Sequence, residues 1–198
     1  MKKASMKPDA EIFTERLRLR PPSLEDAEPI FHRYGQDAEV CRYMSWRPHR
    51  SVDDTLEFLN RIVADNAAGR SEGYLIFAKH TGELLGSVGG GIDGHRMQFG
   101  YLIARDAWGR GYATEAATAF LSAAFGKNPS LLRIQAYCDV KNPRSAHVLE
   151  KAGLSLEGTL RRYLVLPNLG DTPRDVFMYA KRREGCFESN AVIARAFT

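Results

Sequence analysis

The stretch of sequence that decides the fold is residues 98–116, which read QFGYLIARDAWGRGYATEA. An apolar run from Met97 to Ile103 is typical of a buried strand, and the residues after Gly111 carry apolar side chains at helical spacing. Gly109 and Gly111 lie between the two patterns. Glycines permit a tight turn close to a ligand, and the free N–H groups that begin a helix attract anions. The stretch therefore predicts a phosphate-binding turn, although a turn that only connects strand to helix is the alternative.

The hydrophobic pattern outside this stretch predicts further strands and helices. Apolar residues at helical spacing predict helices over residues 23–33, 52–63, 111–125 and 144–152. Short apolar or alternating runs predict strands over residues 14–20, 74–79, 84–88, 97–103, 131–140, 154–166 and 175–181. Strands on both sides of one central strand–helix–strand unit indicate an α+β (mixed α/β) domain around one mostly antiparallel sheet. Gly100, inside a strand pattern, predicts a β-bulge, with a glycine that fits a bulky cross-strand neighbour as the alternative.

Length and composition predict a single domain without disulfides. The 198 residues are 44% hydrophobic and 26% charged, which is enough for one self-sufficient core. The three cysteines are far apart and form neither a CxxC pair nor a cluster with histidine, so no metal site is expected. We expect a single domain over residues 11–183, a flexible leader over residues 1–10 and a C-terminal tail over residues 184–198.

Charge and hydropathy limit the partners and the compartment. No apolar stretch is long enough for a signal peptide or a membrane span, so we expect a soluble, cytoplasmic protein without a membrane partner. The formal net charge of +4 favours anionic partners, yet the basic residues are scattered and form no dense patch. A small polyanionic cofactor fits this distribution better than nucleic acid does. The glycine turn lacks the Gly-Lys-Ser or Gly-Lys-Thr of a P-loop and the N-terminal strand–helix–strand unit of a dinucleotide-binding fold.

The glycine turn resembles motif A of the GNAT superfamily of N-acetyltransferases. The pyrophosphate loop of that motif has Gln or Arg, two residues, Gly, one residue, and Gly or Ala; Gly111 and Ala113 fill the last two positions. Trp108 stands at the first position, as in the RimJ and RimL branch of ribosomal-protein alanine acetyltransferases, which this segment is similar to. Further segments resemble that branch in order and spacing at residues 14–20, 42–49, 84–88, 142–145, 150–154 and 157–161.

The resemblance implies a fold and an activity. The implied GNAT fold has one central, mostly antiparallel sheet of about six to seven strands flanked by about four helices, with a splayed V between the two central strands. The implied activity is acetyl-CoA-dependent transfer of an acetyl group to a primary amine by direct attack in a ternary complex. The acceptor would be a protein N-terminus or a small-molecule amine. The resemblance also allows a homodimer.

The resemblance carries over to individual residues on the cofactor side. Free backbone groups of the strand would hold the pantetheine arm and polarise the thioester carbonyl, and the amides of the glycine turn would hold the pyrophosphate. The residues expected to bind acetyl-CoA are Leu102, Ile103, Ala104, Trp108, Gly109, Arg110, Gly111, Tyr112, Ala113, Thr114 and Asn142. For Asn142, an ordinary helix cap is the alternative.

Ser145 is the expected catalytic residue, because the serine of this branch is placed to hydrogen-bond the departing sulfur. Many relatives have a tyrosine acid four positions later, where this chain has Leu149. Ser145 would otherwise be part of an ordinary helix start. The residues expected to bind the acceptor are Trp46, His49, Gln98 and Tyr101. A core lid is the alternative for Trp46, and a surface histidine is the alternative for His49.

The sequence provides no clear general base. Gln98 and Leu164 stand where relatives place acidic residues, and neither can accept a proton near neutral pH. Asp93, His95 and Asp175 are each more typical of a turn, a surface or a strand pair, so none is assigned, and water is an alternative route. A non-catalytic acyl-CoA-binding or sensor module is therefore a second hypothesis, and nucleic-acid binding is a weaker third.

Overall fold

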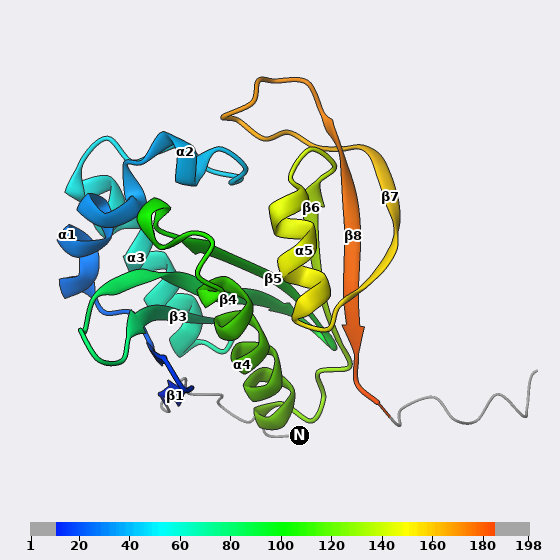
Figure 1. Ribbon diagram of the computed structural model, residues 1–198, viewed down its shortest axis with the longest axis horizontal. Coiled ribbons are helices and arrows are strands. Elements are labelled where there is room, and N and C mark those ends of the chain that lie inside the picture. The colour runs from blue at the N-terminus through cyan, green and yellow to red at the C-terminus, as the bar shows by residue number, and fades with distance from the viewer. Residues whose placement is uncertain (1–10, 185–198) are drawn as a thin grey trace, which may run out of the picture.

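The computed structural model describes residues 11–184 and contains one eight-stranded sheet with strand order β1-β2-β3-β4-β5-β6-β8-β7 (Figure 1). The strands are β1 (Ile12–Phe13), β2 (Leu17–Arg20), β3 (Ser71–Ala78), β4 (Leu84–Asp93), β5 (Arg96–Ile103), β6 (Arg133–Asp139), β7 (Ser155–Leu164) and β8 (Arg174–Arg182). The α-helices are α1 (Ala27–Ile30), α2 (Ala38–Cys41), α3 (Val52–Ala67), α4 (Tyr112–Lys127) and α5 (Pro143–Lys151). Short helical turns are η1 (Leu24–Asp26), η2 (Phe31–Gly35) and η3 (Arg105–Ala107). The expected leader and all but the first residue of the expected tail lie outside the described residues.

The sheet is antiparallel except where β5 meets β6. These strands pair in parallel only over residues 96–98 and 133–135, and beyond this point they diverge (Figure 1). The expected V between the two central strands is thereby confirmed. A parallel pair needs a crossover, and α4 provides it between β5 and β6.

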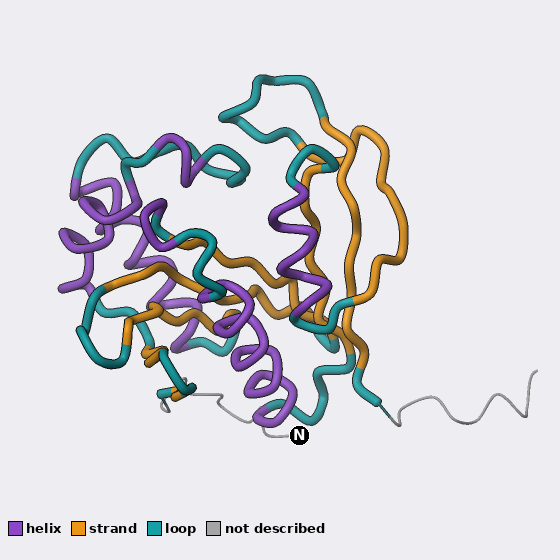
Figure 2. The backbone as a smooth tube through the Cα atoms, in the orientation of Figure 1, coloured by secondary structure: helices purple, strands orange, loops and turns teal. Residues whose placement is uncertain are grey.

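Helices cover both faces of the sheet because side chains alternate along each strand. Tyr74 and Ile76 of β3 belong to a cluster with Phe120 of α4, whereas Leu75 belongs to a second cluster with Leu59 of α3. α4 and α5 lie side by side on the first face, and α1 packs with α3 on the second (Figure 2). The space between β5 and β6 therefore opens toward α4 and α5 on one side and toward α3 on the other.

The expected elements are present, with differences that have local causes. The sheet has eight strands rather than six or seven, because the two-residue β1 is too short to give a sequence pattern. The predicted helix over residues 23–33 is divided into η1, α1 and η2. The chain stays helical through Pro29 because this proline lies in the first turn of α1, where a missing N–H is tolerated. Asp26 accepts hydrogen bonds from the backbone and hydroxyl of Ser23 at 2.7 and 3.0 Å, which caps the start of η1.

The predicted bulge at Gly100 is wrong. β4 and β5 pair without a register shift from residue 96 to residue 103, and Gly100 faces Gly89 directly. A Cβ added at Gly100 would have no heavy atom within 4 Å, so its missing side chain leaves open space rather than room for a bulky neighbour.

Within residues 11–184, no helix is long and apolar enough to cross a membrane.

Candidate active site

The connection from β5 to α4 has the geometry of an anion-binding turn. Gly109 and Gly111 have φ angles of 75° and 81°, in the left-handed region that favours glycine. Gly111 is the N-cap of α4, and the first intrahelical bond runs from the Glu115 N–H to the Gly111 carbonyl at 3.1 Å. The N–H groups of residues 112–114 thus have no partner in the helix, and the positive end of the helix dipole lies among them.

The segment before β2 fixes this turn through Glu115. Its carboxylate accepts hydrogen bonds from the Thr14 hydroxyl at 2.5 Å and from the Arg16 backbone and Nε at 3.0 and 2.7 Å. Arg16 also donates to the Arg110 carbonyl at 3.0 Å and lies over the Tyr112 ring at 4.8 Å. Burial acts to raise the pKa of Glu115, but the bonds from Thr14 and Arg16 outweigh it, and the pKa is lowered. The carboxylate is therefore a structural clamp.

The backbone of β5 presents free groups to the V at alternate residues. The Ala104 N–H donates to the Leu85 carbonyl of β4 at 2.8 Å. Because hydrogen-bonding groups alternate in direction along an antiparallel strand, the backbone groups of Leu102 also point toward β4, at Ser87. The Tyr101 and Ile103 backbone groups therefore face the V. The Ile103 carbonyl accepts from the Trp108 indole at 2.7 Å, which leaves its N–H and the Tyr101 groups in the gap. Of the three expected strand positions, only Ile103 offers a backbone group to the V.

Tyr101 and Ser145 meet across the V. The Tyr101 hydroxyl donates to Ser145 Oγ at 3.2 Å. Burial raises the pKa of Tyr101 to about 12, so this hydroxyl keeps its proton and the Ser145 hydrogen is free to bond elsewhere. The Asn142 side chain accepts from the Ser145 N–H at 3.2 Å and caps α5, which fixes the serine at the helix start.

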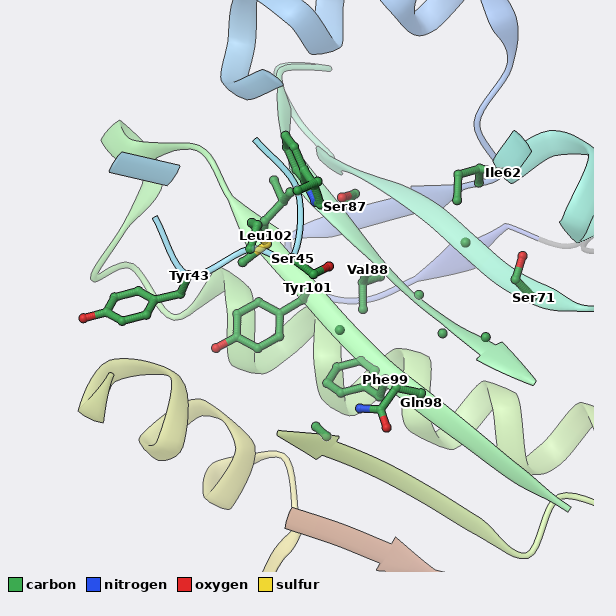
Figure 3. Close-up of a pocket in the computed structure, with 18 of the residues that line it drawn as sticks. Tyr43, Ser45, Ile62, Ser71, Ser87, Val88, Gln98, Phe99, Tyr101 and Leu102 are labelled. Atoms are coloured by element: carbon green, nitrogen blue, oxygen red, sulfur yellow. The ribbon is translucent and has the colours of Figure 1, made fainter. Parts of the chain in front are cut away.

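A cavity of about 500 Å³ connects the V to the α3 face of the sheet (Figure 3). Its floor is formed by glycines that register places on that face, namely Gly73, Gly89, Gly91 and Gly100. The expected site residues that line it are Trp46, His49, Gln98, Tyr101, Leu102, Asn142 and Ser145. The other expected cofactor residues lie along the β5–α4 connection, outside the cavity lining. One cavity therefore joins the expected acceptor residues to the expected sulfur-binding serine.

Aromatic rings form one wall of this cavity. The rings of Trp46, His49 and Phe58 lie within 5.0 to 6.1 Å of one another. Nδ1 of His49 is 2.7 Å from the Thr55 hydroxyl, and burial lowers the pKa of His49. Asn168, in the β7–β8 loop, donates to the carbonyls of Trp46 at 2.7 Å and Cys41 at 2.6 Å, so the far end of the chain holds this wall in place.

The family profile described as the acetyltransferase (GNAT) domain matches residues 16–155. The chain belongs to the GNAT acetyltransferase family. It is 32% identical over 155 residues to the N-acetyltransferase p20 of Bacillus licheniformis, an uncharacterized protein, over 77% of this chain and 86% of that one. It is 26% identical to the spermidine N(1)-acetyltransferase of Escherichia coli K12, over 73% of this chain and 75% of that one.

Solved structures share the fold of this GNAT acetyltransferase. A GNAT-family acetyltransferase from Bacillus anthracis is 27% identical with a TM-score of 0.75, over 87% of this chain and 98% of that one. RimL, a ribosomal alpha-N-protein acetyltransferase in complex with coenzyme A, is 20% identical with a TM-score of 0.78, over 87% of this chain and 98% of that one. The resemblance to the family that the sequence carries is confirmed, and the chain is an acyltransferase of the GNAT fold.

Asp93, His95 and Asp175, the side chains considered as bases, lie away from the cavity of this GNAT acetyltransferase. Asp93 pairs with Arg96 at 2.6 Å, Asp175 pairs with Arg161 at 2.6 Å, and His95 is exposed in the β4–β5 turn. None of these three lines the cavity.

Sequence reasoning missed Glu72, an acidic residue in an apolar strand. Its side chain is 4% exposed, and its Oε2 has no hydrogen-bond partner among the described residues. Burial raises its pKa, against the opposing effect of Lys127. Glu72 is among the residues around the cavity, but register pairs it with Gly90, which in turn pairs with Phe99. This row lies on the α4 face, away from the glycine floor. A lone carboxylate among β-branched and aromatic strand residues was the available signal.

Proposed function

We propose that this GNAT acetyltransferase transfers an acetyl group from acetyl-CoA to a primary amine by direct attack within a ternary complex. The observation that carries the proposal is the continuous cavity from the glycine floor on the α3 face to the Tyr101–Ser145 pair in the V. Acceptor and donor can therefore approach from opposite faces and meet between β5 and β6. When bound, acetyl-CoA supplies a thioester whose sulfur leaves as a thiol.

The residues present fit this cofactor. The unpaired amides of residues 112–114 would bind the pyrophosphate, and the Ile103 N–H and Tyr101 backbone groups would bind the pantetheine amides and the acetyl carbonyl. Leu102 and Ala104 would contact the arm beside these groups, together with Trp108, Gly109, Arg110 and Asn142. The printed partners of structural neighbours, such as coenzyme A for RimL, support the same cofactor.

The chain contributes hydrogen bonds rather than a proton to the leaving sulfur. A thiol of ordinary pKa, about 8.5, is a stronger acid than Tyr101, so neither Tyr101 nor the weaker acid Ser145 would release its own proton to a thiolate. Ser145, held by Tyr101, would donate a hydrogen bond to the sulfur as the C–S bond breaks. The attacking nitrogen loses one proton when the C–N bond forms, and that proton balances the departing thiolate.

The α3 face of the cavity, where the glycine floor lies, offers no free carboxylate among the described residues to deprotonate an ammonium ion. Among the described lining residues, Asp65 pairs with Arg70 at 2.6 Å, Asp139 pairs with Arg174, and Glu72 faces α4. His49, the histidine of the cavity wall, is a weakened base because its pKa is lowered, and its Nδ1 is bonded to Thr55. We therefore expect the amine to enter as the free base. We expect kcat/KM to rise tenfold per pH unit until the pH reaches the pKa of the amine, without a plateau set by a protein carboxylate.

A thiol-release assay with acetyl-CoA and a panel of amines and N-terminal peptides tests the proposal. Ser145→Ala should lower kcat about 10- to 100-fold with little change in KM, because a hydrogen bond to a charged sulfur is worth about 1.5–3 kcal/mol. Ser122→Ala, at an exposed serine of α4, is the matched control and should retain full activity. Binding of acetyl-CoA without thiol release for any acceptor would instead support a non-catalytic module.

A further inference from the structure

A directional chain of hydrogen bonds ends in the acceptor cavity at Gln98. It begins at Glu157 of β7, whose two oxygens accept from Arg133 of β6 at 2.9 and 2.5 Å. Arg133 Nε donates to Gln135 Oε1 at 2.7 Å, and Gln135 Nε2 donates to Gln98 Oε1 at 3.2 Å. The last bond crosses from β6 to β5 at the vertex of the V, where the strands still pair.

The arginine fixes the orientation of both amides. A guanidinium can only donate, so the atom of Gln135 that faces Arg133 must be its oxygen. The Gln135 nitrogen then faces Gln98 and requires an oxygen there. If either amide were turned over, a donor would meet a donor, and the chain would lose a hydrogen bond at a partly buried position.

Gln98 consequently offers an N–H donor to the cavity. Its oxygen is already engaged, and its side-chain nitrogen points away from that oxygen, on the side toward Tyr101 (Figure 3). Gln98 lies on the α3 face of β5, two residues before the exposed Gly100 and opposite Gly91 of β4. A Cβ at Gly91 or Gly100 would meet no heavy atom within 4 Å, so an acceptor can lie directly against this part of the floor.

This donor repels one class of amine and suits another. A polyamine has protonated amines besides the reacting one, and these carry only donors and need carboxylates, whereas the lining carboxylates among the described residues are paired or face α4. A carbonyl or carboxylate oxygen would complete the hydrogen bond of Gln98. The rings of Trp46, His49 and Phe58 offer an apolar wall for the rest of the acceptor.

We propose that Gln98 is a specificity-determining residue that selects acceptors with a carbonyl or carboxylate oxygen next to the amine and an apolar or aromatic body, and disfavours polyamines. The proposal rests on the proposed function in that the cavity is taken as the acceptor site. The acceptor class is therefore an α-amino carbonyl compound with a large apolar side chain.

Two probes that differ by one group test this proposal. Phenylalaninamide and phenethylamine share an aromatic body and a primary amine, and only the former has a carbonyl. Calorimetry in the presence of coenzyme A should give a dissociation constant about five- to tenfold lower for phenylalaninamide, as one neutral hydrogen bond predicts. Spermidine should bind more weakly than either.

Variants locate the preference in Gln98. The ratio of the two dissociation constants should fall to about one in Gln98→Leu and should invert in Gln98→Glu, since a carboxylate repels the carbonyl and attracts an ammonium. Gln135→Leu frees the Gln98 amide to turn and should reduce the ratio without a change in the cavity lining. Gln36→Leu, at an exposed glutamine outside the cavity, should leave the ratio as in the wild type. Each dissociation constant is expressed for the free-base form of the amine, because the carboxamide of phenylalaninamide lowers the pKa of its own amine relative to phenethylamine. Changes in the ratio then report on the protein alone.

Thiol release, measured in parallel, separates the two proposals. A Gln98-dependent ratio without thiol release would overturn the transferase proposal and retain the specificity. Thiol release with a ratio that Gln98→Leu leaves unchanged would overturn the specificity and retain the transferase. Tighter binding of spermidine, or no binding of either aromatic probe, would also overturn the specificity.

Discussion

Asp139→Asn should destabilise the fold because it breaks a buried ion pair at the end of β6. The Asp139 side chain is fully buried, whereas the Arg174 side chain is 23% exposed. The carboxylate accepts from Arg174 Nε and, at 3.2 Å, from Arg174 Nη2, and it also accepts from the Lys141 N–H at 2.8 Å. This residue joins β8 to the turn that leads into α5 and so to Ser145.

The magnitude follows from the geometry. Loss of one partner from a buried pair costs about 3–5 kcal/mol. Asparagine keeps an oxygen for Lys141, and Arg174 can reach solvent, so we place the loss of unfolding free energy at the low end, about 3 kcal/mol. For a domain of this size, that loss lowers Tm by about 6–12 °C.

Urea unfolding at pH 7 measures the loss, and the chain supplies a matched control. Asp175→Asn removes the same charge from the neighbouring Asp175–Arg161 pair, whose arginine is 79% exposed, and should leave the unfolding midpoint nearly unchanged. The double variant Asp139→Leu with Arg174→Met should be more stable than Asp139→Asn, since no charge remains unpaired. Equal losses for Asp139→Asn and Asp175→Asn would refute the reasoning.

The stability that Asp139 contributes changes with pH in a defined direction. Burial acts to raise the pKa of Asp139, but the bonds from Arg174 and Lys141 outweigh it, and the pKa is lowered. A carboxyl whose folded pKa lies below its unfolded value of about 3.9 stabilises the fold fully above that pH and loses this effect as the pH falls through the folded value. The gap between wild type and Asp139→Asn should therefore be constant above about pH 5 and shrink toward pH 2.

Three other predictions concern single side chains. Gly111→Ala should weaken coenzyme A binding at least tenfold by calorimetry and lower the unfolding free energy by about 1–2 kcal/mol, because the φ angle of Gly111 is 81°. The control Gly126→Ala, inside α4, should leave binding unchanged and raise Tm. Gly86→Ala should cost about 3 kcal/mol in urea unfolding, because a Cβ would lie 2.2 Å from the Leu102 carbonyl; a loss below 1 kcal/mol would contradict that contact. Because the pKa of His49 is lowered in the folded protein, protonation of this histidine destabilises the fold as the pH falls from 7 to 5. His49→Phe should remove this part of the stability loss, which thermal melts at both pH values measure.

Local signals in the sequence predicted the glycine turn to which the proposal assigns the cofactor. The Gly109–Gly111 turn and the start of α4 depend on residues close together in the chain, so glycine placement and hydrophobic spacing are enough to locate them. The same holds for the helix starts after Ser51 and Asn142, where a side-chain oxygen accepts from the N–H three residues later at 3.2 Å in each case. The resemblance to the GNAT family added the order of these segments.

The acceptor side depends on contacts that no local pattern contains. Gln98 and Gln135 are 37 positions apart and meet only because β5 and β6 pair in parallel, and Asn168 reaches Trp46 across 122 positions. Gly100 was expected to mark a bulge, whereas its function in the fold is to leave space on the cavity floor. A sequence records that a side chain is missing, but the neighbouring strands decide what occupies the space.

The short seam between β5 and β6 divides the hydrogen-bonded sheet into two blocks of strands. Strands β1 to β5 form one block and β6 to β8 the other, and they share a ladder over only residues 96–98 and 133–135. Regions with few shared hydrogen bonds open separately in native-state hydrogen exchange. The divergence that opens the V thus also leaves the two blocks joined by only a short ladder, and a ligand that spans both strands, as proposed for acetyl-CoA, would act as the missing rungs.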